Sequence, residues 1–137
     1  MKKVFLIIMI SLGLFFLNSC EKPENKICAC GVKNPAKNLP WLAEFIKKAK
    51  NDTIGCCFGA MWLANCDGQD FFVTDMPLYG SPGSGSLLLK VFNCEGKREY
   101  EFIEYESPES FMEAYDYLLT HMKYETVIYA HPDYPLN

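Results

Sequence analysis

The chain has 137 residues, of which 50% are hydrophobic, 22% charged and 15% aromatic. This composition excludes a disordered tail and a collagen-like fibre, and the length suits one domain. Without residues 1–19, which hold no acidic residue, 11 Lys and Arg stand against 17 Asp and Glu, a net charge of −6. An acidic balance argues against a nucleic-acid partner, because binding phosphates needs clustered Lys and Arg.

The N-terminal residues have the pattern of an export signal. Lys2 and Lys3 precede the apolar run Val4–Leu17. As a helix, this run would extend about 21 Å, less than the ~30 Å thickness of a membrane's hydrocarbon core. We therefore expect residues 1–19 to be a signal peptide and not a membrane-spanning anchor.

The signal ends in Leu17-Asn18-Ser19-Cys20. This segment resembles the lipobox of bacterial lipoproteins, and the resemblance implies that the Cys20 thiol receives a diacylglyceryl group before cleavage on its N-terminal side. The expected partner is then a membrane, held through acyl chains. Glu21 is not the aspartate that retains some lipoproteins in the inner membrane, which favours the outer membrane. The alternative is ordinary signal cleavage, with Cys20 in a disulfide.

Residues 20–38 are predicted to form a lipidated tether, because Pro, Asn and charged residues dominate them. Its far half contains two cysteines and is expected to be attached to the domain, residues 39–137. The first helix of that domain is predicted to begin with Asn38 as its cap and Pro40 in its first turn. Helical spacing predicts its buried stripe as Leu42, Phe45, Ile46 and Ala49.

Two similar segments then predict two β-hairpins. Each places Asn-Cys-acid-Gly between apolar runs, at residues 65–68 and 93–96. An acidic residue followed by Gly suits a tight hairpin turn. With the connecting loop at 77–86, we expect four strands in a meander.

A second helix is predicted to start at Ser107-Pro108, and a last strand at Thr126–Ala130. The buried stripe of this helix is predicted to be Phe111, Ala114, Tyr115, Leu118 and Met122. The expected fold class is α+β, in the order α-β-β-β-β-α-β. Its antiparallel sheet has about four to five strands, two hairpins plus the C-terminal strand, with both helices packed on one face.

Six cysteines remain beyond Cys20, and an even number in an exported chain of this size favours a disulfide framework. The candidates are Cys28, Cys30, Cys56, Cys57, Cys66 and Cys94. The similar hairpins favour a Cys66–Cys94 bond, which leaves Cys28 or Cys30 to pair with Cys56 or Cys57. A zinc site or a redox pair is the alternative, although neither the zinc-ligand spacing nor Cys-x-x-Cys is present.

The binding and modification candidates lie in loops. The glycine-rich loop after the first hairpin lacks the ending of a phosphate-binding loop, and its length favours a binding loop. Its candidate residues are Tyr79, Gly80, Ser81, Pro82, Gly83 and Ser84. Tyrosines in or beside loops suggest a surface that recognises proteins or sugars, namely Tyr79, Tyr124, Tyr129 and Tyr134. Asp52-Thr53-Ile54 resembles an acceptor motif for O-linked glycosylation at Thr53.

The segment Cys30–Ile46, with its Asn-Pro…Leu-Pro-Trp-Leu opening, resembles a group of small cysteine-bearing bacterial lipoproteins of unknown function. The resemblance implies an exported, lipid-anchored α+β domain and supplies no catalytic residues. No cofactor or metal is expected, since no catalytic motif is present and both histidines have surface interpretations. We expect a non-enzymatic binding module for a protein or glycan. The alternatives are an inhibitor-like or accessory module that docks on an enzyme, and a periplasmic thiol or metal protein.

Overall fold

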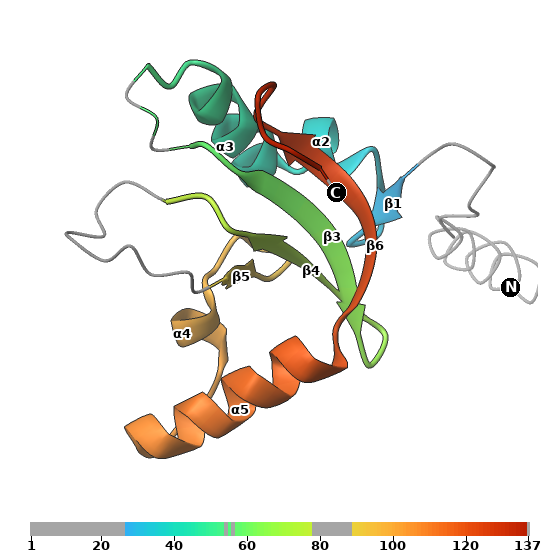
Figure 1. Ribbon diagram of the computed structural model, residues 1–137. Coiled ribbons are helices and arrows are strands. Elements are labelled where there is room, and N and C mark those ends of the chain that lie inside the picture. The colour runs from blue at the N-terminus through green and yellow to red at the C-terminus, as the bar shows by residue number, and fades with distance from the viewer. Residues whose placement is uncertain (1–26, 54, 56, 78–88, 137) are drawn as a thin grey trace, which may run out of the picture.

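A four-stranded antiparallel sheet in the order β5-β4-β3-β6 forms the centre of an α+β fold (Figure 1). The computed structural model describes residues 27–53, 55, 57–77 and 89–136. The strands of the sheet are β3 (Ala60–Cys66), β4 (Gln69–Thr74), β5 (Lys90–Phe92) and β6 (Lys123–Ala130). The predicted α+β class with an antiparallel sheet is confirmed.

Residues 28–38, which the sequence places in the tether, form regular structure. They form a two-stranded antiparallel sheet of β1 (Cys28–Ala29) and β2 (Val32–Lys33), followed by the helix α2 (Pro35–Asn38). Ala29 is buried in the core and Pro35 is fully buried. The folded body therefore includes the far half of the predicted tether.

The first long helix, α3 (Pro40–Lys50), starts with proline as expected. Its N-cap is Leu39, not the predicted Asn38, and no side chain caps it. Proline at the first position lacks an N–H, so one fewer backbone donor needs a partner. Leu42, Ile46 and Ala49 are buried, and Phe45 packs against the same core.

The first predicted hairpin is confirmed. Strands β3 and β4 pair from Met61 with Thr74 to Cys66 with Gln69, leaving a two-residue turn. Asp67 and Gly68 in this turn both have positive φ, +51° and +85°. That conformation matches the right-handed twist of the two strands, and Asp-Gly adopts it readily.

The second predicted hairpin is wrong. After β5 the chain turns at Asn93, whose carbonyl accepts from Gly96 N at 3.0 Å. Only one bridge follows, between Phe92 and Arg98, before the short helix α4 (Glu99–Phe102). Val91 N donates to Glu99 Oε2 at 3.1 Å, so a buried carboxylate satisfies a backbone donor of this edge strand.

The second long helix, α5 (Pro108–His121), begins where the sequence predicts. Ser107 Oγ accepts from Ser110 N at 3.2 Å, and Ser110 Oγ accepts from Ser107 N at 3.0 Å. This reciprocal pair is a capping box. Strand β6 follows directly, as the predicted last strand does, and pairs with β3.

The two long helices lie on opposite faces of the sheet, so the prediction that both pack on one face is wrong (Figure 1). The α3 face has a core built on Leu42, Ile46, Met61, Leu63, Phe72, Met76 and Phe92. The α5 face has a second core built on Ala64, Cys66, Phe71, Val73, Val91, Tyr115 and Met122. The uninterrupted apolar run Phe71–Val73 is the signal in the sequence, because a strand buried on both faces loses its alternation.

Candidate functional site

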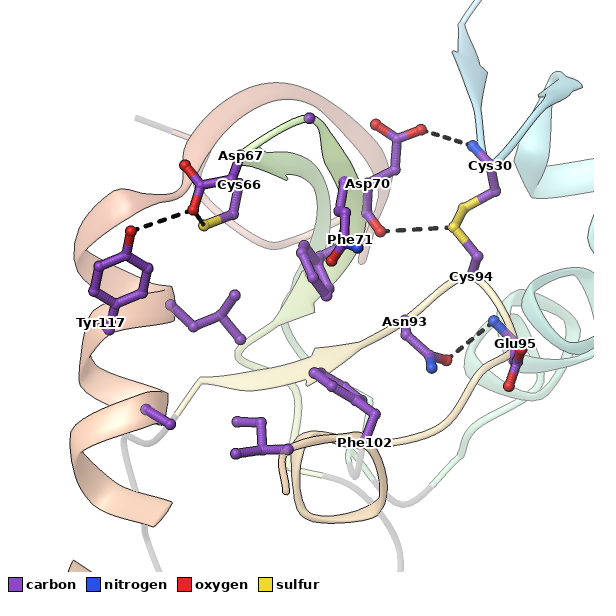
Figure 2. Close-up of a pocket in the computed structure, with 15 residues that line it drawn as sticks. Cys30, Cys66, Asp67, Asp70, Phe71, Asn93, Cys94, Glu95, Phe102 and Tyr117 are labelled. Atoms are coloured by element: carbon purple, nitrogen blue, oxygen red, sulfur yellow. Dashed lines mark hydrogen bonds between the residues drawn. A yellow bond between two sulfur atoms is a disulfide. The ribbon is translucent and has the colours of Figure 1, made fainter. Parts of the chain in front are cut away.

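A pocket of about 670 Å³ lies where α5 meets the end of the sheet (Figure 2). Its wall is assembled from the turn between β1 and β2, the β3–β4 turn with the start of β4, the turn after β5, the end of α4 and the middle of α5. A pocket of this size accommodates a small molecule or a few residues of a peptide. We call it the α5 pocket below.

The inner surface of the α5 pocket is apolar. Five hydrophobic side chains line it, namely Phe71, Phe102, Ile103, Ala114 and Leu118. The rings of Phe71 and Phe102 stack with their centroids 5.8 Å apart. A ligand can bury hydrocarbon surface here without displacing the sheet.

Asp67 places a carboxylate at one side of the pocket, beside Cys66 and Tyr117 (Figure 2). Tyr117 Oη donates to Asp67 Oδ2 at 3.3 Å, and Cys66 Sγ lies 3.9 Å from the same oxygen. The Asp67 charge raises the pKa of Tyr117. Burial, followed by the Asp67 charge, raises the pKa of Cys66. A raised pKa keeps the Cys66 thiol protonated, which is the opposite of what a reactive cysteine needs.

At the other side of the pocket lies a disulfide between Cys30 and Cys94. Asp70 Oδ2 accepts from Cys30 N at 2.7 Å, and the Asp70 carbonyl oxygen lies 3.6 Å from Cys94 Sγ, so Asp70 lies against both cysteines. The predicted Cys66–Cys94 bond is therefore wrong. It assumed two equivalent hairpins, and the second hairpin does not form.

The six cysteines of the predicted disulfide framework do not all form disulfide bonds. Cys28 is disulfide-bonded, whereas Cys57 and Cys66 are buried thiols. Cys57 therefore does not bridge to Cys30 as the sequence suggested. Cys56 lies outside the described residues, as does the lipidation candidate Cys20.

The polar rim of the α5 pocket is acidic. Of the residues that line it, three carry carboxylates (Asp67, Asp70 and Glu95), and none is Lys, Arg or His. Asp70 is occupied by Cys30 N and by Asn65 Nδ2 at 3.0 Å, and Glu95 pairs with Lys97 at 3.2 Å near the surface. Asp67 is the remaining carboxylate, and its contacts with Tyr117 and Cys66 are to uncharged groups.

The other predicted site residues are scattered. The candidate binding loop, Tyr79 to Ser84, lies outside the described residues, and Thr53 is exposed in the bend after α3. Tyr124 is exposed and Tyr134 half-buried, but Tyr129 is buried in the α3-side core. Tyr129 is a buried residue of β6, so the expectation that it belongs to an exposed surface in or beside a loop is wrong.

The pocket itself could not be predicted from the sequence. Cys66 and Cys94 were singled out for disulfide pairing and Asp67 only as part of a turn, while Phe102 and Tyr117 carried no motif. They meet only because α4 and α5 cover the sheet face to which Cys66 and Phe71 belong. The Asp-Gly turn was the one available signal, and it indicated a hairpin.

Within the described ranges, no group of His, Cys, Asp and Glu side chains has the arrangement of a metal site. No helix in that part of the chain is long and apolar enough to cross a membrane. Comparison with protein-family models, with curated proteins and with solved structures finds no match to this chain.

Proposed function

We propose that this protein is a lipid-anchored module of the cell envelope, without catalytic activity of its own, that binds a partner protein through the α5 pocket. The ligand we infer is a short segment that carries an apolar side chain next to Lys or Arg. The supporting observation is the apolar inner surface beside Asp67, a carboxylate with no cation among the described residues that line the pocket. A cationic ligand group there would gain a charge-assisted hydrogen bond.

Other features of the pocket favour binding over chemistry. The raised pKa of Cys66, caused first by burial, supports a structural thiol. The acidic rim disfavours phosphorylated or nucleic-acid ligands, because like charges repel in a partly buried site. An inhibitor-like or accessory module would use the same surface, with an enzyme as the partner.

The ligand is tested by selecting peptides from a random display library on the immobilised protein. We expect the selected peptides to pair an apolar residue with Lys or Arg. Asp67→Asn should weaken the best peptide by about tenfold or more, the usual effect of losing a charged hydrogen-bond partner. This substitution suits the fold, since Asn-Gly is a preferred pair for such a turn.

The matched control is Tyr100→Ala in α4, because Tyr100 is 52% exposed and does not line the pocket. It should leave peptide affinity unchanged, whereas Tyr117→Ala, also at a 52% exposed position, should weaken it. Selection of acidic peptides, or equal affinity for the wild type and Asp67→Asn, would contradict the proposed ligand.

The anchor is tested separately in a bacterial host that processes lipoproteins. Mass spectrometry of the mature N-terminal peptide should show acyl chains on Cys20, and the protein should sediment with membranes. Cys20→Ser should abolish both results, while Ser19→Ala, which keeps a small residue before the cysteine, should preserve them. A mature wild-type peptide without acyl chains would refute the proposed lipid anchor, but it would not affect the proposal for the α5 pocket.

A further inference from the structure

The helical layers on the two faces of the sheet carry opposite charge. Residues 33–52, which contain the end of β2 and all of α2 and α3, hold five Lys and two acidic residues, a net charge of +3. Residues 99–122, which contain α4 and α5, hold seven acidic residues and no Lys or Arg, a net charge of −7 with His121 neutral. Because α3 and α5 cover opposite faces of the sheet, the two charges lie on opposite sides of the molecule (Figure 1).

The lysines on the α3 side are available to a partner. All five are exposed, namely Lys33, Lys37, Lys47, Lys48 and Lys50. Lys48 pairs with Glu44 at 2.9 Å, and Asp52 accepts from Cys57 N at 2.7 Å. Within the described part of the chain, the other four lysines form no ion pair. An anionic partner therefore meets four ammonium groups without breaking an existing pair. We call the five lysines the basic face.

The N-terminal segment joins the folded body beside the basic face. Strand β1 starts at Cys28, which pairs with Lys33 of that face. Six residues separate Ile27 from Cys20, so the chain between these two residues extends at most about 25 Å. Acyl chains on Cys20 would therefore hold this end of the basic face near the membrane surface.

We propose that the basic face docks on an anionic phospholipid surface and so directs the α5 pocket away from the membrane. This inference rests on the lipid anchor of the proposed function and adds the orientation of the folded body. A negatively charged surface attracts each nearby Lys and repels the carboxylates of α4 and α5, so both layers favour the same orientation. Because the tether makes docking intramolecular, a weak attraction is sufficient. A partner protein then reaches the α5 pocket without meeting the membrane.

The basic face is tested without the anchor, so that acyl chains contribute nothing. The chain carries Cys20→Ser behind a cleavable signal peptide that replaces residues 1–19, and every described residue is kept. Sedimentation is measured with vesicles of phosphatidylcholine and with vesicles of equal parts phosphatidylcholine and phosphatidylglycerol. We expect binding to the phosphatidylglycerol vesicles only. This binding should be lost when salt is raised from about 0.1 M to about 1 M, which shortens the Debye length from ~10 to ~3 Å.

Single substitutions locate the contact. Lys37→Gln and Lys47→Gln should each weaken vesicle binding by about fivefold, the effect of losing one Lys near an anionic surface. The matched control is Lys123→Gln, which removes the same charge from an exposed position directly after α5 and should leave binding unchanged. Lys37→Arg keeps the charge and should retain binding. Circular dichroism checks that the variants fold.

Lysine labelling then measures the orientation of the bound protein. On phosphatidylglycerol vesicles, an amine-reactive ester should label Lys33, Lys37 and Lys47 more slowly than in the free protein, with Lys123 unchanged, as read by peptide mass mapping. Equal binding to both vesicle types, protection of Lys123 instead, or binding to heparin but not to vesicles would overturn the inference. Because this chain has no acyl group, a failure of Cys20 acylation or of peptide selection at the α5 pocket is recorded separately from a failure of the basic face.

Discussion

Asp67 has two roles, one through its backbone and one through its side chain. Its backbone adopts the positive φ that the β3–β4 turn requires, and its carboxylate faces Tyr117 and Cys66 in the α5 pocket. A turn residue is held firmly by the two strands that it joins, so its carboxylate is preorganised for a ligand.

Asp67→Asn should make Cys66 more reactive. Burial is the main cause of the raised pKa of Cys66, and the Asp67 charge is the second. Removing that charge should lower the pKa and increase the thiolate fraction. The rate of Cys66 alkylation by iodoacetamide at pH 8, followed by peptide mass mapping, should rise several-fold, with Cys57 alkylation as the internal control. An unchanged or slower Cys66 rate would show that the Asp67 charge does not reach the thiol.

Gly96 is predicted to tolerate substitution worse than Gly68. Both have positive φ, +78° and +85°, so alanine should cost about 1–2 kcal/mol of unfolding free energy at either. At Gly96 an added Cβ would also lie 2.7 Å from Cγ and Cδ2 of Trp41, while nothing lies within 4 Å at Gly68. Urea unfolding should therefore show Gly96→Ala to be less stable than Gly68→Ala by about 1–3 kcal/mol. Equal losses would mean that the Trp41 indole moves aside freely.

Among the elements, α5 forms the wall of the α5 pocket on the side of Asp67 and Cys66 (Figure 2). Tyr115 anchors it to the sheet face, and the Tyr115 hydroxyl donates to the carbonyl of Leu89 next to β5. Tyr117 and Leu118, one turn further along, line the pocket.

The buried Tyr115 hydroxyl predicts a loss of stability at alkaline pH. Burial, with a further contribution from Glu99, raises the pKa of Tyr115 to about 12. Above pH 10 the unfolded chain releases this proton while the folded chain keeps it, so the unfolding free energy falls between pH 10 and about 12. The contribution is at most about 1.4 kcal/mol per pH unit. Tyr115→Phe should be less stable at pH 7 by about 1 kcal/mol but show a shallower alkaline slope in urea unfolding. Parallel slopes for the two proteins would refute the assignment.

At the scale of the whole molecule, the Cys30–Cys94 disulfide ties the N-terminal segment to the turn after β5 across a sequence separation of 64 residues. A long closed loop restricts the unfolded chain strongly. The same bond lies in the α5 pocket wall, so it fixes the position of that wall as well as the stability of the body.

The double variant Cys30→Ser/Cys94→Ser should lose about 4 kcal/mol of unfolding free energy in guanidinium chloride, as expected for a loop of this length. The matched control is Cys66→Ala, which removes the thiol that the hairpin similarity would have paired with Cys94. It should cost only about 1 kcal/mol through lost packing. If Cys66→Ala lost more unfolding free energy than the double variant, the result would favour a Cys66–Cys94 bond and contradict the Cys30–Cys94 bond.

The sequence alone determined the features that depend on neighbouring residues. The start of α5 at Ser107-Pro108, the turn at Asp67-Gly68 and the buried stripe of α3 follow from capping, turn chemistry and helical spacing, which act over a few residues.

Only the tertiary structure decided that the helices lie on opposite faces, that Cys94 bonds to Cys30, and that a carboxylate of α4 replaces a predicted strand. These outcomes depend on which distant surfaces bury one another, and many pairings of similar local segments satisfy the same local rules. The α5 pocket belongs to this second group, because its walls come from five separate parts of the chain.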